Sequence, residues 1–151
     1  MPSLITQEEL EALVGTPFPG GTYTVEPFVN WLTCDCVLAA DLIPAGAAHP
    51  LLVYVAGQAG IGLSLAELFT LCSASSEDGP MLGEWGMEVN RPIQVGAEYV
   101  VSGGIANVVR KTGKKTGVFD IVRFELELRS TASSAQPDAT VHSSFIYPRR
   151  R

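Results

Sequence analysis

The sequence predicts an α+β domain in which a curled antiparallel sheet wraps around one long, buried central helix. Residues 57–71 are apolar nearly all round a helical projection, a pattern typical of a helix covered on every side. From residue 81 onward the apolar residues recur at every second position, which is the period of β-strands. A sheet that wraps around the apolar helix satisfies both observations, because each element then buries its apolar surface on the other.

Composition supports one compact domain over residues 1–151. Hydrophobic residues make up 46% of the chain and charged residues 17%, which excludes wholesale disorder. There are 10 Lys and Arg against 16 Asp and Glu, giving a net charge of -6. Because nucleic-acid binding needs a basic face, no nucleic-acid partner is expected.

No targeting, membrane or disulfide signal is apparent. The N-terminus lacks the basic start and apolar stretch of a secretory signal. The longest apolar region, residues 51–71, is interrupted by Gly57, Gly60, Gly62 and Glu67, which is too broken for a membrane span. Three cysteines, an odd number, argue against a disulfide framework. We therefore expect a cytoplasmic protein with reduced thiols and no membrane partner.

The first elements begin at recognisable signals. Thr6 and Glu9 have the spacing of a capping box, so a short helix should start there and end at Gly15. The turn-forming residues 17–21 follow, and residues 22–25 are β-prone enough for a first strand.

A second helix is predicted over residues 28–40. Pro27 suits the first position of a helix, and Pro44 to Gly46 end the element. Apolar residues follow at helical spacing, namely Phe28, Trp31, Leu32 and Cys36. The polar residues 73–80 form a loop after the predicted central helix.

The second half of the chain should form three or four long strands. Alternating apolar residues mark segments at 81–93, 99–109, 118–128 and 141–147, and the glycine- and lysine-rich residues 111–117 predict a hairpin between two of them. In the third segment one face is strongly apolar, carrying Val118, Val122, Phe124, Leu126 and Leu128.

Three stretches of the sequence point to a known family. They are residues 14–25 (VGTPFPGGTYTV), residues 89–98 (VNRPIQVGAE) and residues 142–147 (HSSFIY). Together with the wrapped-helix pattern, they resemble the hot-dog fold of the MaoC-like (R)-specific enoyl-CoA hydratases and 3-hydroxyacyl dehydratases. The resemblance extends over roughly residues 10–148.

The resemblance implies an acyl-thioester site at a subunit interface, with coenzyme A or a carrier protein holding the acyl group. The acyl chain would lie beside the central helix, and free N–H groups at the start of that helix would polarise the thioester carbonyl. Gly57 and Gln58 are then expected near those N–H groups, and Tyr54 could offer its hydroxyl to the ligand. A packing role remains open for all three residues. No cofactor and no metal is expected.

The catalytic motif of the family, Asp-x-x-x-x-His, does not carry over. Alignment of the second helix puts Cys34 and Ala39 at the Asp and His positions. The remaining candidates are Asp35, Asp41 and His49, because a histidine paired with a carboxylate can act as a general base near neutral pH. Solvent-exposed or loop positions are the alternative interpretation of these three residues.

Three functions follow as hypotheses. The first is a hydro-lyase, of the enoyl hydratase or 3-hydroxyacyl dehydratase type, with a non-standard acid/base site. The second is a catalytically silent hot-dog subunit that binds the acyl chain for an active partner. The third is a hot-dog thioesterase that would use a carboxylate such as Glu67. Each is compatible with a homodimer or with a heterodimer containing a related hot-dog subunit.

Two further groups of residues could have a chemical role. Cys34 and Cys36 lie two residues apart on a predicted helix, so their sulfurs point apart and do not chelate a metal together. A local basic patch could contact coenzyme A phosphates or be a solvated hairpin tip; it comprises Arg110, Lys111, Lys114 and Lys115. Residues 149–151 are interpreted as a solvated tail.

Overall fold

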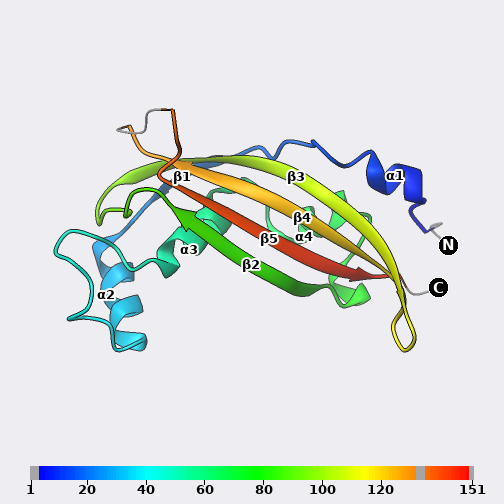
Figure 1. The fold of residues 1–151 in the computed structure, drawn as a ribbon, viewed down its shortest axis with the longest axis horizontal. Helices are drawn as coiled ribbons and strands as arrows, with labels where there is room; N and C mark the ends of the chain where they lie inside the picture. The colour runs from blue at the N-terminus through cyan, green and yellow to red at the C-terminus, as the bar shows by residue number, and fades with distance from the viewer. Residues whose placement is uncertain (1–3, 132–134, 150–151) are drawn as a thin grey trace.

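A single curled sheet covers one side of the helices. The computed structural model describes residues 4–131 and 135–149. The sheet is antiparallel and five-stranded, in the order β1-β3-β4-β5-β2 (Figure 1). Its strands are β1 (Gly21–Thr24), β2 (Met81–Val89), β3 (Glu98–Gly113), β4 (Gly117–Arg129) and β5 (Ala139–Pro148). The predicted α+β class and curled antiparallel sheet are therefore confirmed.

The helices precede the long strands in the chain, as the sequence predicts. They are α1 (Gln7–Glu11), α2 (Pro27–Cys36), α3 (Leu51–Gly60), α4 (Leu65–Leu71) and the 3-10 turn η1 (Ser76–Asp78). The predicted capping box is present at α1, where the Thr6 hydroxyl accepts from the Glu9 N–H and the Glu9 carboxylate accepts from the Thr6 N–H. Pro27 is at the start of α2, as expected.

The central helix differs from the prediction, because the apolar segment forms two helices rather than one. They are α3 and α4, which meet at an angle of 68°. Gly62 has a left-handed backbone (φ 80°), and Ser64 then caps α4 by accepting from the Glu67 N–H. A glycine turn followed by a capping box ends one helix and begins another. Within the described part of the chain, no single helix is long and apolar enough to cross a membrane; α3 and α4 meet that test only when taken together across their bend.

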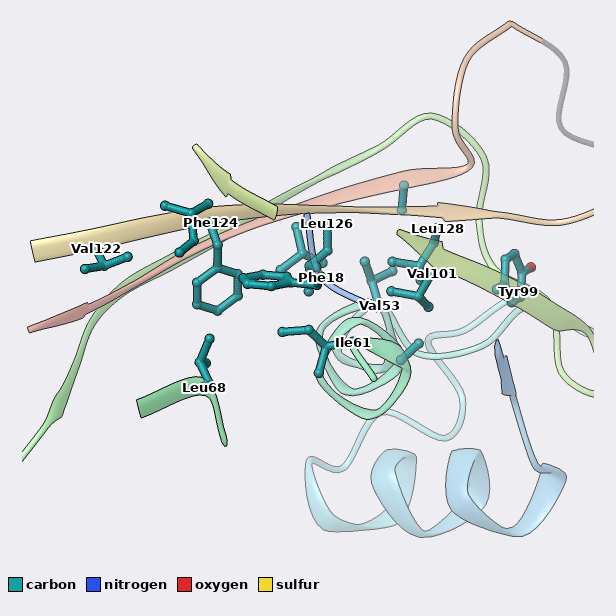
Figure 2. Close-up of a cluster of buried hydrophobic side chains, with 14 of the residues drawn as sticks. Phe18, Val53, Ile61, Leu68, Tyr99, Val101, Val122, Phe124, Leu126 and Leu128 are labelled. Carbon is teal, nitrogen blue, oxygen red and sulfur yellow. The ribbon is translucent and has the colours of Figure 1, made fainter. Parts of the chain in front are cut away.

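The hydrophobic core lies between the concave face of the sheet and the helices. Figure 2 shows α3 end-on beneath the sheet, with Val53 and Ile61 directed toward Val101 of β3 and Leu126 of β4. Four of the five side chains of the apolar face predicted for residues 118–128 are buried, and Val118 at its end is partly buried. Gly60 lets α3 approach closely, because a Cβ at this position would lie 2.7 Å from the Cβ of Val101.

A buried ionic cluster closes the end of the sheet near the C-terminus. The Asp120 carboxylate, which has no exposed surface, accepts from Nε of Arg110 at 2.7 Å and from Nε of Arg149 at 2.6 Å. Arg149 also donates to the carbonyls of Cys72 and Ser73, each at 2.7 Å. Arg149 is therefore not part of a solvated tail, since it holds the end of α4 to the sheet; residues 150 and 151 lie outside the described residues.

Candidate functional site

The start of α3 is fixed by a chain of local hydrogen bonds. His49 and Pro50 immediately precede the helix, and Pro50 is its N-cap residue. Asn30 of α2 accepts the N–H of His49 through its Oδ1 at 2.7 Å. Nδ1 of His49 in turn accepts the N–H of Leu51 at 3.1 Å. The side chains of α2 and of the preceding loop therefore cap α3.

The N–H groups at the start of α3 are therefore hydrogen-bonded within the chain and are not free to polarise the carbonyl of a ligand. Leu52 donates to the carbonyl of His49 at 2.9 Å, and Val53 donates to that of Pro50 at 3.0 Å. Pro50 itself has no N–H. Gly57 and Gln58 lie in the second half of α3, because the helix begins at Leu51 and not at residue 57. The expected position of both residues beside free helix-start N–H groups is therefore wrong.

The three predicted acid/base residues are not joined to one another by hydrogen bonds. His49 is partly buried, whereas Asp35 on α2 and Asp41 in the loop after it are exposed. No hydrogen bond or ion pair joins His49 to either carboxylate in the described structure. Nδ1 of His49 is engaged with the N–H of Leu51, so this ring nitrogen is hydrogen-bonded within the chain and not to a carboxylate. The predicted pairing of His49 with a carboxylate thus has no bonded contact to support it.

An apolar cavity of about 270 Å³ lies between α2 and the start of α3. Its lining comprises Val29, Leu32, Thr33, Cys36, Val37 and Leu51. The one hydroxyl in this lining, that of Thr33, already donates to the carbonyl of Val29 at 2.8 Å. The cavity is open to solvent, and its walls are apolar apart from this hydroxyl, which is already hydrogen-bonded.

The opposite side of α3 faces the edge strand β2. The ring of Tyr54 lies 4.8 Å from that of Trp85, centroid to centroid. Gln58 is one helical turn beyond Tyr54, on the same side of α3. Its Nε2 is buried and has no hydrogen-bond partner among the described residues. A buried donor without a partner is costly.

The remaining candidate groups have structural roles. The Glu67 carboxylate accepts from the N–H and hydroxyl of Ser64, and these hydrogen bonds lower the pKa of Glu67. Arg110 of the predicted basic patch is bound to Asp120. The lysines of that patch lie on the hairpin between β3 and β4, at the opposite end of the sheet from α2 (Figure 1). Among the described residues, no three His, Cys, Asp or Glu side chains gather closely enough to hold a metal ion.

Two features of this region were missed by the sequence analysis. The cavity between α2 and α3 depends on tertiary packing, so no local sequence pattern predicts it. Asn30 is different, because an amide side chain between the apolar residues Val29 and Trp31 was a visible signal for a specific hydrogen bond.

The architecture is the hot-dog fold, as the sequence resemblance implies. No family model matches the sequence, and no curated protein matches it. Solved structures do match the fold. The ChsH1-ChsH2 complex from Mycobacterium tuberculosis is similar at a TM-score of 0.66 and 14% identity, over 95% of this chain and 90% of that chain. A MaoC-like dehydratase from Rhodospirillum rubrum is similar at a TM-score of 0.60 and 14% identity, over 97% of this chain and 99% of that chain.

A third similar structure is also a complex. It is the C-terminally truncated HadBC (3R-hydroxyacyl-ACP dehydratase) complex from Mycobacterium tuberculosis, at a TM-score of 0.63 and 14% identity, over 89% of this chain and 96% of that chain. The structural neighbours are thus MaoC-like and related hot-dog proteins. At these identities the likeness establishes the fold, and function has to be argued from the site.

Proposed function

We propose that this protein is a hot-dog subunit that binds an acyl thioester and acts with a related subunit, which supplies the acid/base pair of a hydro-lyase. The observation that carries the proposal is the start of α3. Its N–H groups are engaged within the chain, and His49 contacts Asn30 and Leu51 rather than a carboxylate. The apolar cavity beside it offers space for an acyl chain. Binding is therefore better supported than unaided catalysis.

A partner subunit would complete the sheet along β2. This strand is nine residues long and lies at the edge of the sheet, so one side of its backbone is unpaired. Its exposed apolar side chains are Met81, Leu82, Trp85 and Val89. A long apolar edge is a template for pairing with another chain. A subunit added there would lie next to Trp85, whose ring packs against that of Tyr54.

Two of the similar structures support a two-subunit assembly at the level of the fold. Both the ChsH1-ChsH2 and the HadBC structures are complexes, and HadBC is a 3R-hydroxyacyl-ACP dehydratase. A division of labour between binding and acid/base chemistry would explain why this chain departs from the Asp-x-x-x-x-His motif.

The second candidate is that the chain itself is the hydro-lyase, using His49 with Asp35 or Asp41. Its support is the position of His49, which is partly buried and directly precedes Leu51 in the wall of the apolar cavity. The thioesterase hypothesis has no such support, because the Glu67 carboxylate is occupied in capping α4.

Hydration of crotonyl-CoA, followed as loss of enoyl absorbance, separates these candidates. We expect no hydration by the purified chain alone, and hydration when a MaoC-like subunit from the same organism is added. Hydration by the chain alone that is lost in His49→Ala and retained in His142→Ala would establish the second candidate instead. His142 is the matched control, since it is the only other histidine and lies on β5. Release of free thiol would indicate a thioesterase.

A further inference from the structure

The helix α2 presents its largest apolar side chains to solvent. Phe28 is 62% exposed, Trp31 64% and Leu32 46%. The side chains that α2 turns toward the protein are smaller or polar, including Asn30 and the buried Cys34. Phe28, Trp31 and Leu32 lie three and four positions apart, so they form one continuous stripe along the helix. Such a stripe normally faces the protein core, whereas here the described residues of the chain leave it exposed.

The exposed apolar surface continues past the end of α2. Leu38 is 88% exposed and Leu42 is 77% exposed. Leu38 also has a left-handed backbone, with φ of 55°, which a leucine rarely adopts. We call Phe28, Trp31, Leu32, Leu38 and Leu42 the α2 surface. Large apolar patches are uncommon on single soluble proteins and mark sites of interaction.

Charge determines which partner fits the α2 surface. Residues 1–90 contain 11 Asp and Glu but no Lys or Arg, and all 10 Lys and Arg follow from residue 91 onward. Three of those carboxylates, on Glu26, Asp35 and Asp41, belong to α2 or its flanking residues and are exposed. The α2 surface is therefore an apolar patch within an acidic segment.

The described arginines are paired with carboxylates away from the α2 surface, and the lysines lie far from it. Each described arginine has a carboxylate partner: Arg91 with Asp138, Arg110 and Arg149 with Asp120, Arg123 with Glu84, and Arg129 with Glu127. The lysines lie on the β3–β4 hairpin, at the far end of the molecule from α2 (Figure 1). The acidic charge around the α2 surface is consequently not neutralised by the described part of the chain.

We propose that the α2 surface docks a different subunit, whose own apolar surface is bordered by Lys and Arg side chains. The proposal rests on the two-subunit function proposed above, and it states the chemistry of the partner. A second copy of this chain fits less well, because symmetric pairing through α2 would bring the acidic set Glu26, Asp35 and Asp41 of one copy against the same acidic set of the other. Like charges placed across an interface oppose association, whereas complementary charges favour it and select the partner.

Trp31 is expected to be the anchor of this interface. It is the most exposed side chain of the α2 stripe, and tryptophan is among the residues that contribute most to binding energy. The carboxylates around it should add an attraction that weakens with salt, because salt screens exposed charges beyond a distance of about 10 Å at 0.1 M.

The test uses the MaoC-like subunits of the same organism, purified one at a time, with binding measured by titration calorimetry and analytical ultracentrifugation. One subunit should bind, and binding should weaken at higher salt. Trp31→Ala should weaken binding roughly 30-fold. Asp35→Lys combined with Asp41→Lys should also weaken it, and should reduce the salt dependence. The matched control is Val100→Ala on β3, a 54% exposed apolar residue outside the α2 surface, which should change binding less than about twofold.

Three results would overturn the proposal. One is a homodimer of this chain that Trp31→Ala dissociates, since a second copy would then occupy the surface. Another is a complex indifferent to both Trp31→Ala and salt. The third is the absence of binding by every subunit. Trp31→Ala should retain the wild-type circular dichroism spectrum, because the side chain is exposed, and this checks that a loss of binding is not a loss of folding.

The docking proposal and the proposed function fail in different ways. A subunit that binds through Trp31 but yields no crotonyl-CoA hydration would leave the docking surface intact and overturn the hydro-lyase function. Hydration by a mixture of the two subunits that Trp31→Ala does not change would leave the function intact and overturn the docking surface.

Discussion

Replacement of Asp120 by asparagine should destabilise the protein strongly, although Asp120 lies away from the candidate site. The carboxylate has no exposed surface and accepts hydrogen bonds from both Arg110 and Arg149. The side chain of Arg149 is only 4% exposed. Asp120→Asn keeps the size of the side chain but removes the charge, which leaves two arginines facing a neutral amide. The change therefore isolates the electrostatic part of the cluster.

The expected loss follows from the burial of the pair. Removing one partner of a buried ion pair costs about 3–5 kcal/mol, because the other charge is left uncompensated in a poorly solvated site. For a protein of this size each kcal/mol lowers Tm by about 2–4 °C, so Tm should fall by about 6–20 °C. The exposed pair of Arg123 and Glu84, whose charged atoms are 4.0 Å apart, is the control. Glu84→Gln should cost at most about 1 kcal/mol.

The same cluster predicts how stability depends on pH. Burial raises the pKa of Asp120, but the hydrogen bonds and charges of Arg110 and Arg149 outweigh burial and hold that pKa below its ordinary value. A carboxyl with a lowered folded-state pKa stabilises the protein above its unfolded pKa of about 3.9, and this contribution is lost as the pH falls through the folded-state value. The stability difference between wild type and Asp120→Asn should hold at pH 7 and pH 5 and shrink below about pH 4.

Thermal and urea unfolding at pH 7, followed by circular dichroism, measure both quantities. A loss of less than about 1 kcal/mol in Asp120→Asn, or a loss equal to that of Glu84→Gln, would refute the reasoning, because the buried pair would then be worth no more than an exposed one.

Three other substitutions test the packing around α3 by urea unfolding. Gly60→Ala should cost about 1–3 kcal/mol, because the added methyl group would overlap Val101. Gly57→Ala should be neutral or stabilising by up to about 1 kcal/mol, because the nearest side chains would lie 3.4 Å from the added Cβ and alanine is the better helix former. Equal losses of stability in Gly60→Ala and Gly57→Ala would contradict the packing described. Asn30→Ala should cost about 1–3 kcal/mol, because the N–H of His49 loses its acceptor. An unchanged stability in Asn30→Ala would mean that Asn30 does not hold the start of α3.

The strands and the first capping box could be predicted because their signals are local. The alternation of apolar residues such as Phe124 and Leu126 is visible in the sequence, and a strand that packs on a core buries its apolar face. The Thr6–Glu9 box likewise involves residues three positions apart. The helical segment was harder, because Gly57 and Gly60 lie inside α3, whereas Gly62 and Ser64 make the break. Several glycines close together do not reveal which of them adopts a left-handed backbone.

The candidate site was predictable only as a set of residues. His49, Asp35 and Asp41 stood out by residue type, yet what each side chain contacts depends on how α2 packs against the start of α3. Asn30 reaches His49 across 19 positions of sequence, a contact for which the sequence has no periodic signal. The same limit applies to Arg149, which is read as a solvated tail until the fold brings it to Asp120 and to the end of α4.

By itself, the sequence determined an α+β arrangement of an antiparallel sheet against apolar helices, because apolar period and capping residues act over a few positions and constrain the elements directly. The hot-dog fold was what the family resemblance implied. Only the tertiary structure decided that the apolar stripe of α2 faces outward, that the N–H groups at the start of α3 are already engaged, and that a buried aspartate joins two arginines. These features depend on which surfaces meet, and an apolar helix has the same sequence pattern whether its own chain or another subunit covers it.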